Sequence, residues 1–262
     1  MEAVLAESKG YEHDETKRLL EELRELFQSR LRVVVSEHSS MRAKEAEQEA
    51  RDPVETFQIE RSGEPIYALC GSVDDLEKIL DAFNEKLNEL YDHFEELLDK
   101  NSGLDDESRE SLECYASAVD KCANVYGTQR RKRLTRFKEL PTVAEIRDEL
   151  QLLFSEIISN YIVVVLCDPL YERVKNGSGP VYEMAVREIN GFLAEVGVYT
   201  KAVAPGEMID PEFMEPTPDS AENYTDDFRR FDVVERIYRY PYLFSDGAKV
   251  IDGRVRIWRR RD

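Results

Sequence analysis

Residues 161–216 read YIVVVLCDPLYERVKNGSGPVYEMAVREINGFLAEVGVYTKAVAPGEMIDPEFMEP, and this stretch decides how the fold is interpreted. Pro180 occupies a position where a helix can begin, because the first helical residue needs no backbone N–H. Apolar residues then recur at steps of three and four, and Gly197 stands where a helix C-cap favours a positive φ. We therefore expect a helix over 180–196, a strand over 198–203 and a proline-punctuated loop over 206–216.

The same stretch carries several short motifs in a defined order. An apolar run leads into Asp168, Leu170, Glu172 and Arg173, and the helix after them ends in Gly197-Val198. Gly206 follows, and then the tract Ile209-Asp210-Pro211-Glu212-Phe213-Met214-Glu215-Pro216. This order resembles the GrpE family, the nucleotide exchange factors of DnaK-type chaperones. The resemblance covers roughly the C-terminal half of the chain, and the N-terminal part matches no family.

The resemblance implies a function and a set of contact residues. It implies a co-chaperone that binds the nucleotide-binding domain of a DnaK-type chaperone and promotes ADP release without a covalent step. A small β-domain would act as the wedge, with its backbone set by Gly197, Gly206, Asp210 and Pro211. The implied contact residues are Met214, Glu215, Tyr242 and Arg254, although ordinary packing is the alternative for Met214 and Tyr242.

Three residues depart from the pattern of that family. Pro141 and Pro169 are expected to break or kink what the family keeps as one long helix. Asp252 stands where the family has an arginine, in the C-terminal β-domain. These departures keep an alternative open, in which the chain is a diverged helical scaffold that has the architecture but no exchange activity.

Composition and charge limit the classes of partner. The chain has 262 residues, 35% of them charged, and a formal net charge of −19. Such a chain repels phosphate backbones and anionic membranes, so we expect neither nucleic acid nor a membrane as a partner. The N-terminus lacks the pattern of a signal peptide, which favours a cytoplasmic location. Cys70, Cys114, Cys122 and Cys167 form no C-x-x-C pair and are expected to be reduced, small apolar residues.

The region 71–196 carries the strongest helical patterns. Ser72 to Asp75 is typical of a capping box, and the helix after it has a narrow apolar stripe that suits a coiled-coil seam. We expect a homodimer through this seam, with packing inside a single-chain bundle as the alternative. The stripe consists of Leu76, Ile79, Phe83, Leu87, Leu90, Phe94 and Leu97.

Further helices are expected on both sides of Pro141. One covers residues 105–126, and another follows a capping box from Thr142 to Glu145. Residues 162–165 are β-branched and would suit a strand, but the resemblance implies a helix there. The basic cluster of Arg130, Arg131, Lys132, Arg133 and Arg136 is interpreted as a salt-bridged helix face rather than a binding site.

The sequence as a whole predicts a mainly α protein with a small C-terminal β-domain, in the α+β class. The predicted divisions are a flexible tail at 1–13, a helix and a β-hairpin at 14–70, helices at 71–196 and a β-domain at 197–262. Within these, the hairpin covers residues 56–69, and strands cover 233–240 and 249–258 with a turn at 245–247. His13, His38 and His93 lie far apart, so we expect no metal site, no cofactor and no enzymatic activity.

Overall fold

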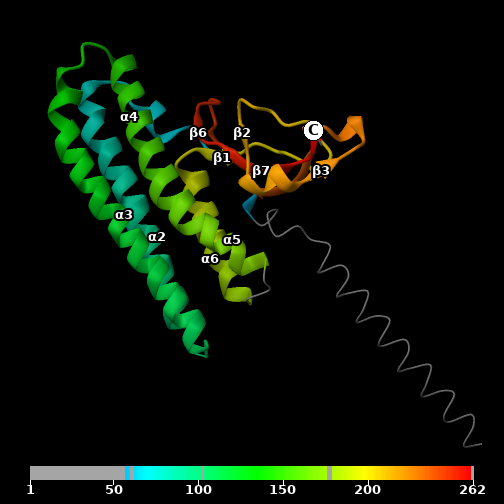
Figure 1. Ribbon diagram of the computed structural model, residues 1–262. Helices are drawn as coiled ribbons and strands as arrows, with labels where there is room; N and C mark the ends of the chain where they lie inside the picture. The colour runs from blue at the N-terminus through cyan, green and yellow to red at the C-terminus, as the bar shows by residue number, and fades with distance from the viewer. Residues whose placement is uncertain (1–56, 60–61, 102, 176–178, 261–262) are drawn as a thin grey trace, which may run out of the picture. The chain divides into compact units, whose positions relative to one another are not determined.

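The computed structural model describes residues 57–59, 62–101, 103–175 and 179–260 (Figure 1). The chain divides into two compact units, residues 1–52 and 53–262, and all of the described residues belong to the second unit. The predicted tail at 1–13 and the predicted helix at 14–35 lie outside the described residues. Within the second unit, helices come first and short strands follow, which confirms the α+β class.

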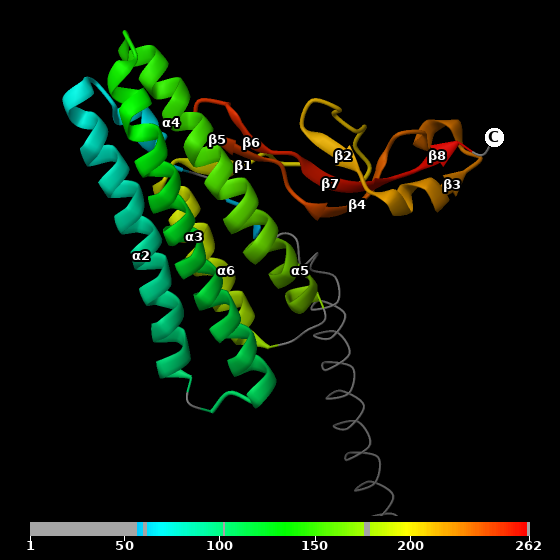
Figure 2. The ribbon, with the colours of Figure 1, turned by 60° about the vertical axis from the view of Figure 1, so that its left-hand side comes forward.

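Four long helical segments pack together in this unit. They are α2 (Leu76–Lys100), α3 (Asp106–Glu139), a compound segment from Val143 to Lys175, and α6 (Pro180–Glu195). Figure 2 shows α2 and α3 lying side by side and running in opposite directions, and α2 also contacts α6. The compound segment consists of α4 (Val143–Ile157), a π-helix (Ile158–Cys167) and α5 (Asp168–Lys175).

Two predicted helix starts are confirmed, but the predicted capping box at Ser72 to Asp75 is not, because a 3₁₀ turn (Val73–Asp75) precedes α2 and neither Ser72 nor Asp75 makes a side-chain capping hydrogen bond. Asp105 caps α3 by accepting a hydrogen bond from the backbone N–H of Ser108, and Thr142 caps α4 by accepting one from Glu145. Pro141 lies between α3 and α4, so the predicted break is confirmed. The second helix, however, runs on to Glu139 rather than ending near residue 126.

The run from Ile158 to Cys167 is helical, although its β-branched residues favour a strand. It forms a π-helix, in which the backbone N–H of Asp168 donates to the carbonyl of Val163 five residues earlier. Pro169 follows directly, in the first turn of α5, and the chain stays helical through it. The expected break at Pro169 is therefore replaced by a local change of helix type.

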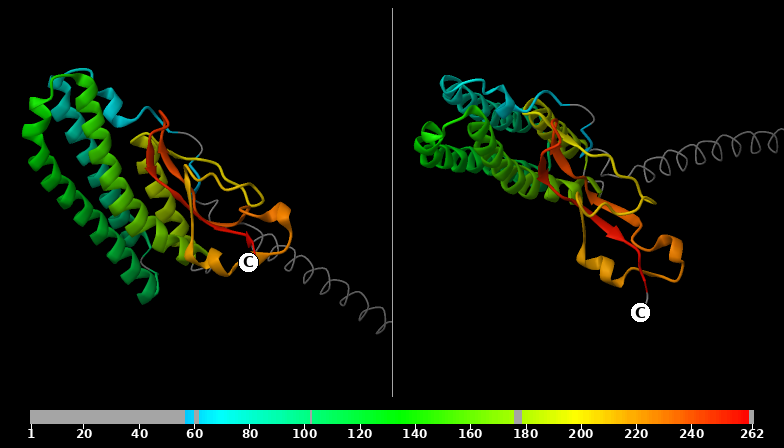
Figure 3. Two further views of the ribbon diagram at one scale, coloured as in Figure 1. Left: turned by 45° about the horizontal axis from the view of Figure 1, so that its top comes forward. Right: turned by 90° about the horizontal axis from the view of Figure 1, so that it is seen from above.

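The strands form three small sheets. The first has the antiparallel order β1 (Val198–Thr200), β5 (Tyr242–Phe244), β6 (Lys249–Ile251). In the second, β7 (Gly253–Ile257) pairs in parallel with β2 (Met214–Pro216) and antiparallel with β4 (Val234–Arg239). The third joins β3 (Tyr224–Thr225) to β8 (Arg259–Arg260) in parallel. Figure 3 shows that the strands gather on one side of the helices.

The predicted strands and the turn at 245–247 are confirmed, but the structure adds four short strands, of which β2 lies in the predicted loop at 206–216 and the others are β3, β5 and β8. The predicted segments 198–203, 233–240 and 249–258 contain β1, β4 and the pair β6 and β7. Gly247, with φ of +90°, forms the predicted turn. The sequence analysis missed β5, and the turn joins β5 to β6 rather than joining the two longer predicted strands.

The predicted hairpin at 56–69 is wrong for the residues that the structure describes. Ile66–Leu69 is a 3₁₀-helix, not a strand. The backbone around it pairs with the end of α6 instead of with a second strand. The N–H of Gly63 donates to the carbonyl of Ala194, and the N–H of Ile66 donates to the carbonyl of Val196. The backbone N–H of Thr200 donates to the carbonyl of Ile59, and the N–H of Ile59 donates to Oγ1 of Thr200 at 2.7 Å. The apolar residues around Gly63 therefore cover the end of α6 and the start of β1 instead of pairing with each other.

The predicted dimerisation seam is also corrected. All seven of its side chains lie inside the single chain, with exposures between 0% and 5%. Phe83 shows how the stripe is covered, since its ring stacks on Phe154 at 4.3 Å and lies 5.0 Å from Tyr126. These residues are not free to meet a second copy, and the alternative of a single-chain bundle is the correct interpretation. The covered residues are Leu76, Ile79, Phe83, Leu87, Leu90, Phe94 and Leu97.

The helices and the strands share one hydrophobic core. A single buried cluster includes residues of α2 and α6 together with Tyr242, Phe244, Val255 and Ile257 of the strands. The predicted divisions at 71–196 and 197–262 are thus parts of one compact unit.

Among the described residues, one helical segment is long and apolar enough to cross a membrane, by length and composition alone. This segment is Val143–Val174, and half of its most apolar stretch is buried inside the protein. Its buried residues include Ile146, Leu150, Phe154 and Ile162, which belong to the shared core. The core helix of a soluble protein passes the same test, so the segment is weak support for a membrane span.

Candidate functional site

The basic cluster at the end of α3 is a salt-bridged helix face, as expected. Arg130 pairs with Asp81 of α2 at 2.6 Å, and Lys138 pairs with Glu77 at 2.7 Å. Arg133 and Arg136 pair with Glu156 and Glu149, and these four residues line an open cleft of about 600 Å³ beside α4. Because its charges are already paired, this cleft offers little to an ionic ligand.

Three of the residues predicted to bind a partner have structural roles instead. Met214 and Tyr242 are buried in the shared core, which is the packing alternative raised for them. Gly197 is buried with φ of +84°, and a Cβ there would lie 2.5 Å from the Cα of Pro65. Met214 and Tyr242 present no side chain to a partner, so their prediction as contact residues is corrected, whereas Gly197 has the backbone role that was predicted for it at the end of α6.

The other five predicted residues lie at least partly at the surface. Glu215 of β2 and Arg254 of β7 are both exposed and are directly paired across the sheet. Gly206 and Pro211 are exposed, with Gly206 at φ of +96°. Asp210 is half-buried, and its hydrogen bond from Lys201 at 2.8 Å holds the pKa of that carboxyl below its usual range.

The strands are joined to the helices by an ion pair. Asp168 at the start of α5 accepts a hydrogen bond from Arg239 of β4 at 2.7 Å, and Arg254 lies 3.5 Å from the same carboxylate oxygen. Next to it, the Cys167 thiol and the Tyr242 hydroxyl form a buried hydrogen bond. Burial raises the pKa of Cys167 to about 12, so the thiol stays protonated and is not a nucleophile at neutral pH.

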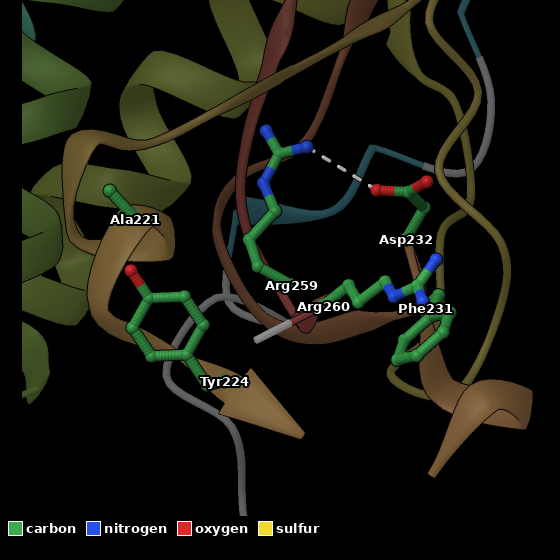
Figure 4. Close-up of a pocket in the computed structure, with 6 residues that line it drawn as sticks. All are labelled: Ala221, Tyr224, Phe231, Asp232, Arg259 and Arg260. Atoms are coloured by element: carbon green, nitrogen blue, oxygen red, sulfur yellow. Dashed lines mark hydrogen bonds and ion pairs between the residues drawn. The ribbon is translucent and has the colours of Figure 1, made fainter. Parts of the chain in front are cut away.

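An open cleft of about 470 Å³ lies at the C-terminal strand (Figure 4). Arg259 and Arg260 come from β8, Tyr224 comes from β3, and Phe231 and Asp232 come from the loop that precedes β4. Arg259 lies 3.4 Å from the carboxylate of Asp232. The cleft therefore combines aromatic side chains with arginines at two successive positions of β8, whose guanidinium groups point in different directions (Figure 4).

The backbone of the cleft is held by hydrogen bonds between segments that are distant in sequence. The backbone N–H of Asp232 donates to the carbonyl of Trp258, and the backbone N–H of Arg259 donates to the carbonyl of Asn223. The buried side chain of Asn223 donates to the carbonyl of Ile257 at 3.0 Å. Among the described residues, Asp232 is the one non-glycine with positive φ, at +59°, a conformation that costs free energy in an L-residue. Such outliers concentrate at functional sites.

More aromatic and basic side chains come from the segments that adjoin the lining residues of this cleft in the sequence. Phe228 is 72% exposed and Tyr224 is 46% exposed. The guanidinium of Arg229 lies over Phe228 at 5.7 Å, and that of Arg230 lies over Trp258 at 5.8 Å. We call this set the arginine–aromatic patch; its residues are Tyr224, Phe228, Arg229, Arg230, Phe231, Trp258, Arg259 and Arg260.

The sequence analysis missed this patch because it treated the Arg130 cluster as the one basic cluster in the chain. The strongly acidic total hides the local composition. Residues 228–260 contain nine Lys and Arg residues against four Asp and Glu residues. The signal was present in the runs FRRF at 228–231 and WRRR at 258–261.

A search of the described residues for metal ligands finds no group of three or more His, Cys, Asp or Glu side chains. His93, for example, pairs with Glu188 at 2.9 Å.

No protein-family model, no curated protein and no solved structure matches this chain.

Proposed function

We propose that this protein acts by binding another protein, without a covalent step, and that its C-terminal strands carry the contact. One observation supports this most directly. The strands and the 3₁₀-helix Phe228–Arg230 between them expose large aromatic and arginine side chains, which are the residue types enriched at the centres of protein interfaces. The ion pair between Asp168 and Arg239 anchors β4 to the helices, so the contact surface has rigid support.

We further propose that the partner is a DnaK-type chaperone and that binding promotes ADP release. Such a protein binds the open form of the nucleotide cleft more tightly than the closed form and so shifts the population toward release. Moving a closed form from 99% to 1% takes about 5.5 kcal/mol of differential binding, which favours a rigid contact surface. The exposed pair Glu215 and Arg254 agrees with this proposal, because both were implied contact residues.

Nucleotide-release kinetics test the exchange proposal. The full chain is titrated into a DnaK-type chaperone that carries a fluorescent ADP analogue, and an accelerated release is expected. The double variant Glu215→Lys with Arg254→Glu should abolish the acceleration, whereas Lys121→Glu on the exposed face of α3 should preserve it. If saturating protein leaves the release rate unchanged, exchange activity is excluded.

A diverged scaffold without exchange activity is the second candidate. The burial of Met214 and Tyr242 favours it, because two of the four implied contact side chains are unavailable. Crosslinking of the full chain in cells would then recover a protein other than a chaperone. The homodimer and the cytoplasmic location stay predictions, and a homodimer would have to use a surface other than the buried stripe of α2.

A further inference from the structure

We propose that the arginine–aromatic patch binds an acidic segment of a partner protein that carries at least one aromatic side chain. The inference rests on the proposed protein-binding function but does not depend on the partner being a chaperone. It assigns the carboxylates of the segment to Arg229, Arg259 and Arg260, and its aromatic ring to the surface between Tyr224 and Phe228.

The arginines of the patch have room for new partners. Among the described residues, Arg229 and Arg260 make no ion pair, although Arg229 stacks on Phe228. The ion pairs of Arg230 with Asp227 at 3.8 Å and of Arg259 with Asp232 at 3.4 Å are long and solvent-exposed. Exposed pairs of this kind contribute little, so a carboxylate from a partner can replace them at small cost. Arginine also binds a carboxylate through two parallel hydrogen bonds, which fixes its orientation.

The aromatic rings give the patch an apolar component. Phe228 and Tyr224 are among the most exposed large hydrophobic residues in the described part of the chain. Their exposure leaves apolar area in water that a partner side chain would cover. An acidic segment with an aromatic residue satisfies both components at once, whereas a segment of carboxylates alone would leave the rings exposed.

The patch is already shaped for binding. Asp227 caps the short 3₁₀-helix Phe228–Arg230 by accepting a hydrogen bond from Arg229, and Phe231 donates back to Phe228. The bond from Asp232 to Trp258 then holds this turn against the end of β7. A preformed surface loses less conformational entropy on binding than a flexible loop does.

Charge distribution favours an acidic peptide over a nucleic acid. Residues 228–260 are locally basic, with nine Lys and Arg residues against four Asp and Glu residues, whereas the chain as a whole carries −19. At physiological salt, exposed charges more than about 8 Å apart are largely screened, so a short acidic segment responds to the arginines of the patch and to Asp227 and Asp232 beside them, and much less to the acidic remainder of the chain. A long phosphate backbone would extend beyond the patch and meet the acidic remainder of the protein.

Fluorescence anisotropy with the full chain tests this assignment. The probe is a short fluorescein-labelled peptide of Asp and Glu that contains two Phe residues. Three comparison probes are the same peptide with Lys for each acid, the same peptide with Ala for each Phe, and a single-stranded thymidine oligonucleotide. We expect the acidic aromatic peptide to bind at least about tenfold more tightly than each of the others, and to weaken as salt rises.

Three variants locate the binding surface. Arg260→Glu and Phe228→Ala should each weaken binding of the acidic aromatic peptide by about tenfold. Arg131→Glu makes the same charge change on the exposed face of α3 and should alter binding by less than about twofold. Circular dichroism and thermal unfolding of each variant show whether the fold is retained, and the exposed positions make large losses unexpected.

Several outcomes would overturn the inference. Equal binding of the acidic and the lysine peptides, tighter binding of the oligonucleotide, or equal effects of Arg260→Glu and Arg131→Glu would each exclude this assignment. Nucleotide-release kinetics and cellular crosslinking with the Arg260→Glu variant distinguish a failure of this patch assignment from a failure of the proposed protein-binding function. If this variant keeps its partner while no peptide binds the wild type, the protein-binding function stands and the patch is not its site.

Discussion

Asp168 at the start of α5 accepts a hydrogen bond from Nη1 of Arg239 in β4 at 2.7 Å, which joins the helices to the strands across 71 residues of sequence. The Arg239 side chain is 9% exposed and that of Asp168 is 22% exposed. Removing one charge of a buried pair leaves the other uncompensated. We expect Asp168→Ala to lower the free energy of unfolding by about 2 kcal/mol, less than for a fully buried pair because water reaches Asp168.

Arg254 provides the matched control for this ion pair. It lies 3.5 Å from the same carboxylate oxygen, but its side chain is largely exposed. Arg254→Ala should therefore cost less than about 1 kcal/mol in urea unfolding. Equal losses for Asp168→Ala and Arg254→Ala would show that burial of Arg239 does not determine the energy of this junction.

Gly197 and Gly206 both have positive φ but differ in what surrounds them. A Cβ on Gly197 would lie 2.5 Å from Pro65 and 2.7 Å from the carbonyl of Glu64, whereas nothing lies within 4 Å of a Cβ on Gly206. Gly206→Ala should lower the free energy of unfolding only by the cost of a positive φ in alanine, about 1–2 kcal/mol. Gly197→Ala has the same cost of positive φ, and its Cβ would also overlap the backbone of Pro65. We therefore expect it to lower the free energy of unfolding at least about twice as much. Urea unfolding of both variants measures the difference, and equal losses would contradict the packing of Pro65 on the end of α6.

The four cysteines should differ sharply in reactivity. Cys70, Cys122 and Cys167 are buried, and burial raises the pKa values of the Cys122 and Cys167 thiols to about 12. Cys114 is exposed on α3. Mass spectrometry of the native protein treated briefly with iodoacetamide should find one modified cysteine, Cys114, and urea should expose the other three. Rapid native labelling at Cys167 would mean that the junction beside Asp168 opens readily.

Acid should weaken the N-terminal cap of α3. The backbone N–H of Ser108 donates to Asp105, and this hydrogen bond holds the pKa of the Asp105 carboxyl below its usual range. Because the pKa is lower in the folded state, the contribution to stability is present above the unfolded pKa of about 4 and is lost as pH falls through the lower folded pKa.

Asp105→Asn tests this dependence without removing the cap, since an Asn side chain also accepts a hydrogen bond from Ser108. The wild type should be more stable than the variant at pH 7, and urea unfolding at decreasing pH should show the difference disappearing. A difference that persists at about pH 2 would assign the effect to something other than ionisation of Asp105.

Local signals in the sequence predicted most of the helix ends. Pro180, Gly197, Pro141 and Thr142 act through backbone geometry and short-range hydrogen bonds, which the neighbouring residues determine. The π-helix at Ile158–Cys167 was not predictable in the same way, because its β-branched residues favour a strand and only burial among the helices overrides that preference.

Long-range contacts and local charge account for the larger errors. The hairpin prediction failed because the partners of Ile59 and Gly63 lie beyond residue 190. The arginine–aromatic patch was missed because Tyr224 and Arg259 meet only through the pairing of β3 with β8, and because a net charge of −19 conceals a basic segment. Periodicity correctly identified the apolar face of α2, but it does not specify whether the same chain or a second copy covers that face.

The variant Leu87→Ala tests in solution whether the same chain or a second copy covers the apolar face of α2. The Leu87 side chain is fully buried within the chain, so Leu87→Ala should lower the unfolding free energy by about 2–5 kcal/mol through lost burial and the cavity that remains. If one chain covers the stripe, this loss is the same at protein concentrations that differ about thirtyfold, because no association is coupled to folding. Asn88→Ala, at the exposed neighbouring position of α2, should change stability by less than about 0.5 kcal/mol. A loss from Leu87→Ala that depends on protein concentration would restore the seam between two copies and would contradict the bundle in which Phe83 stacks on Phe154.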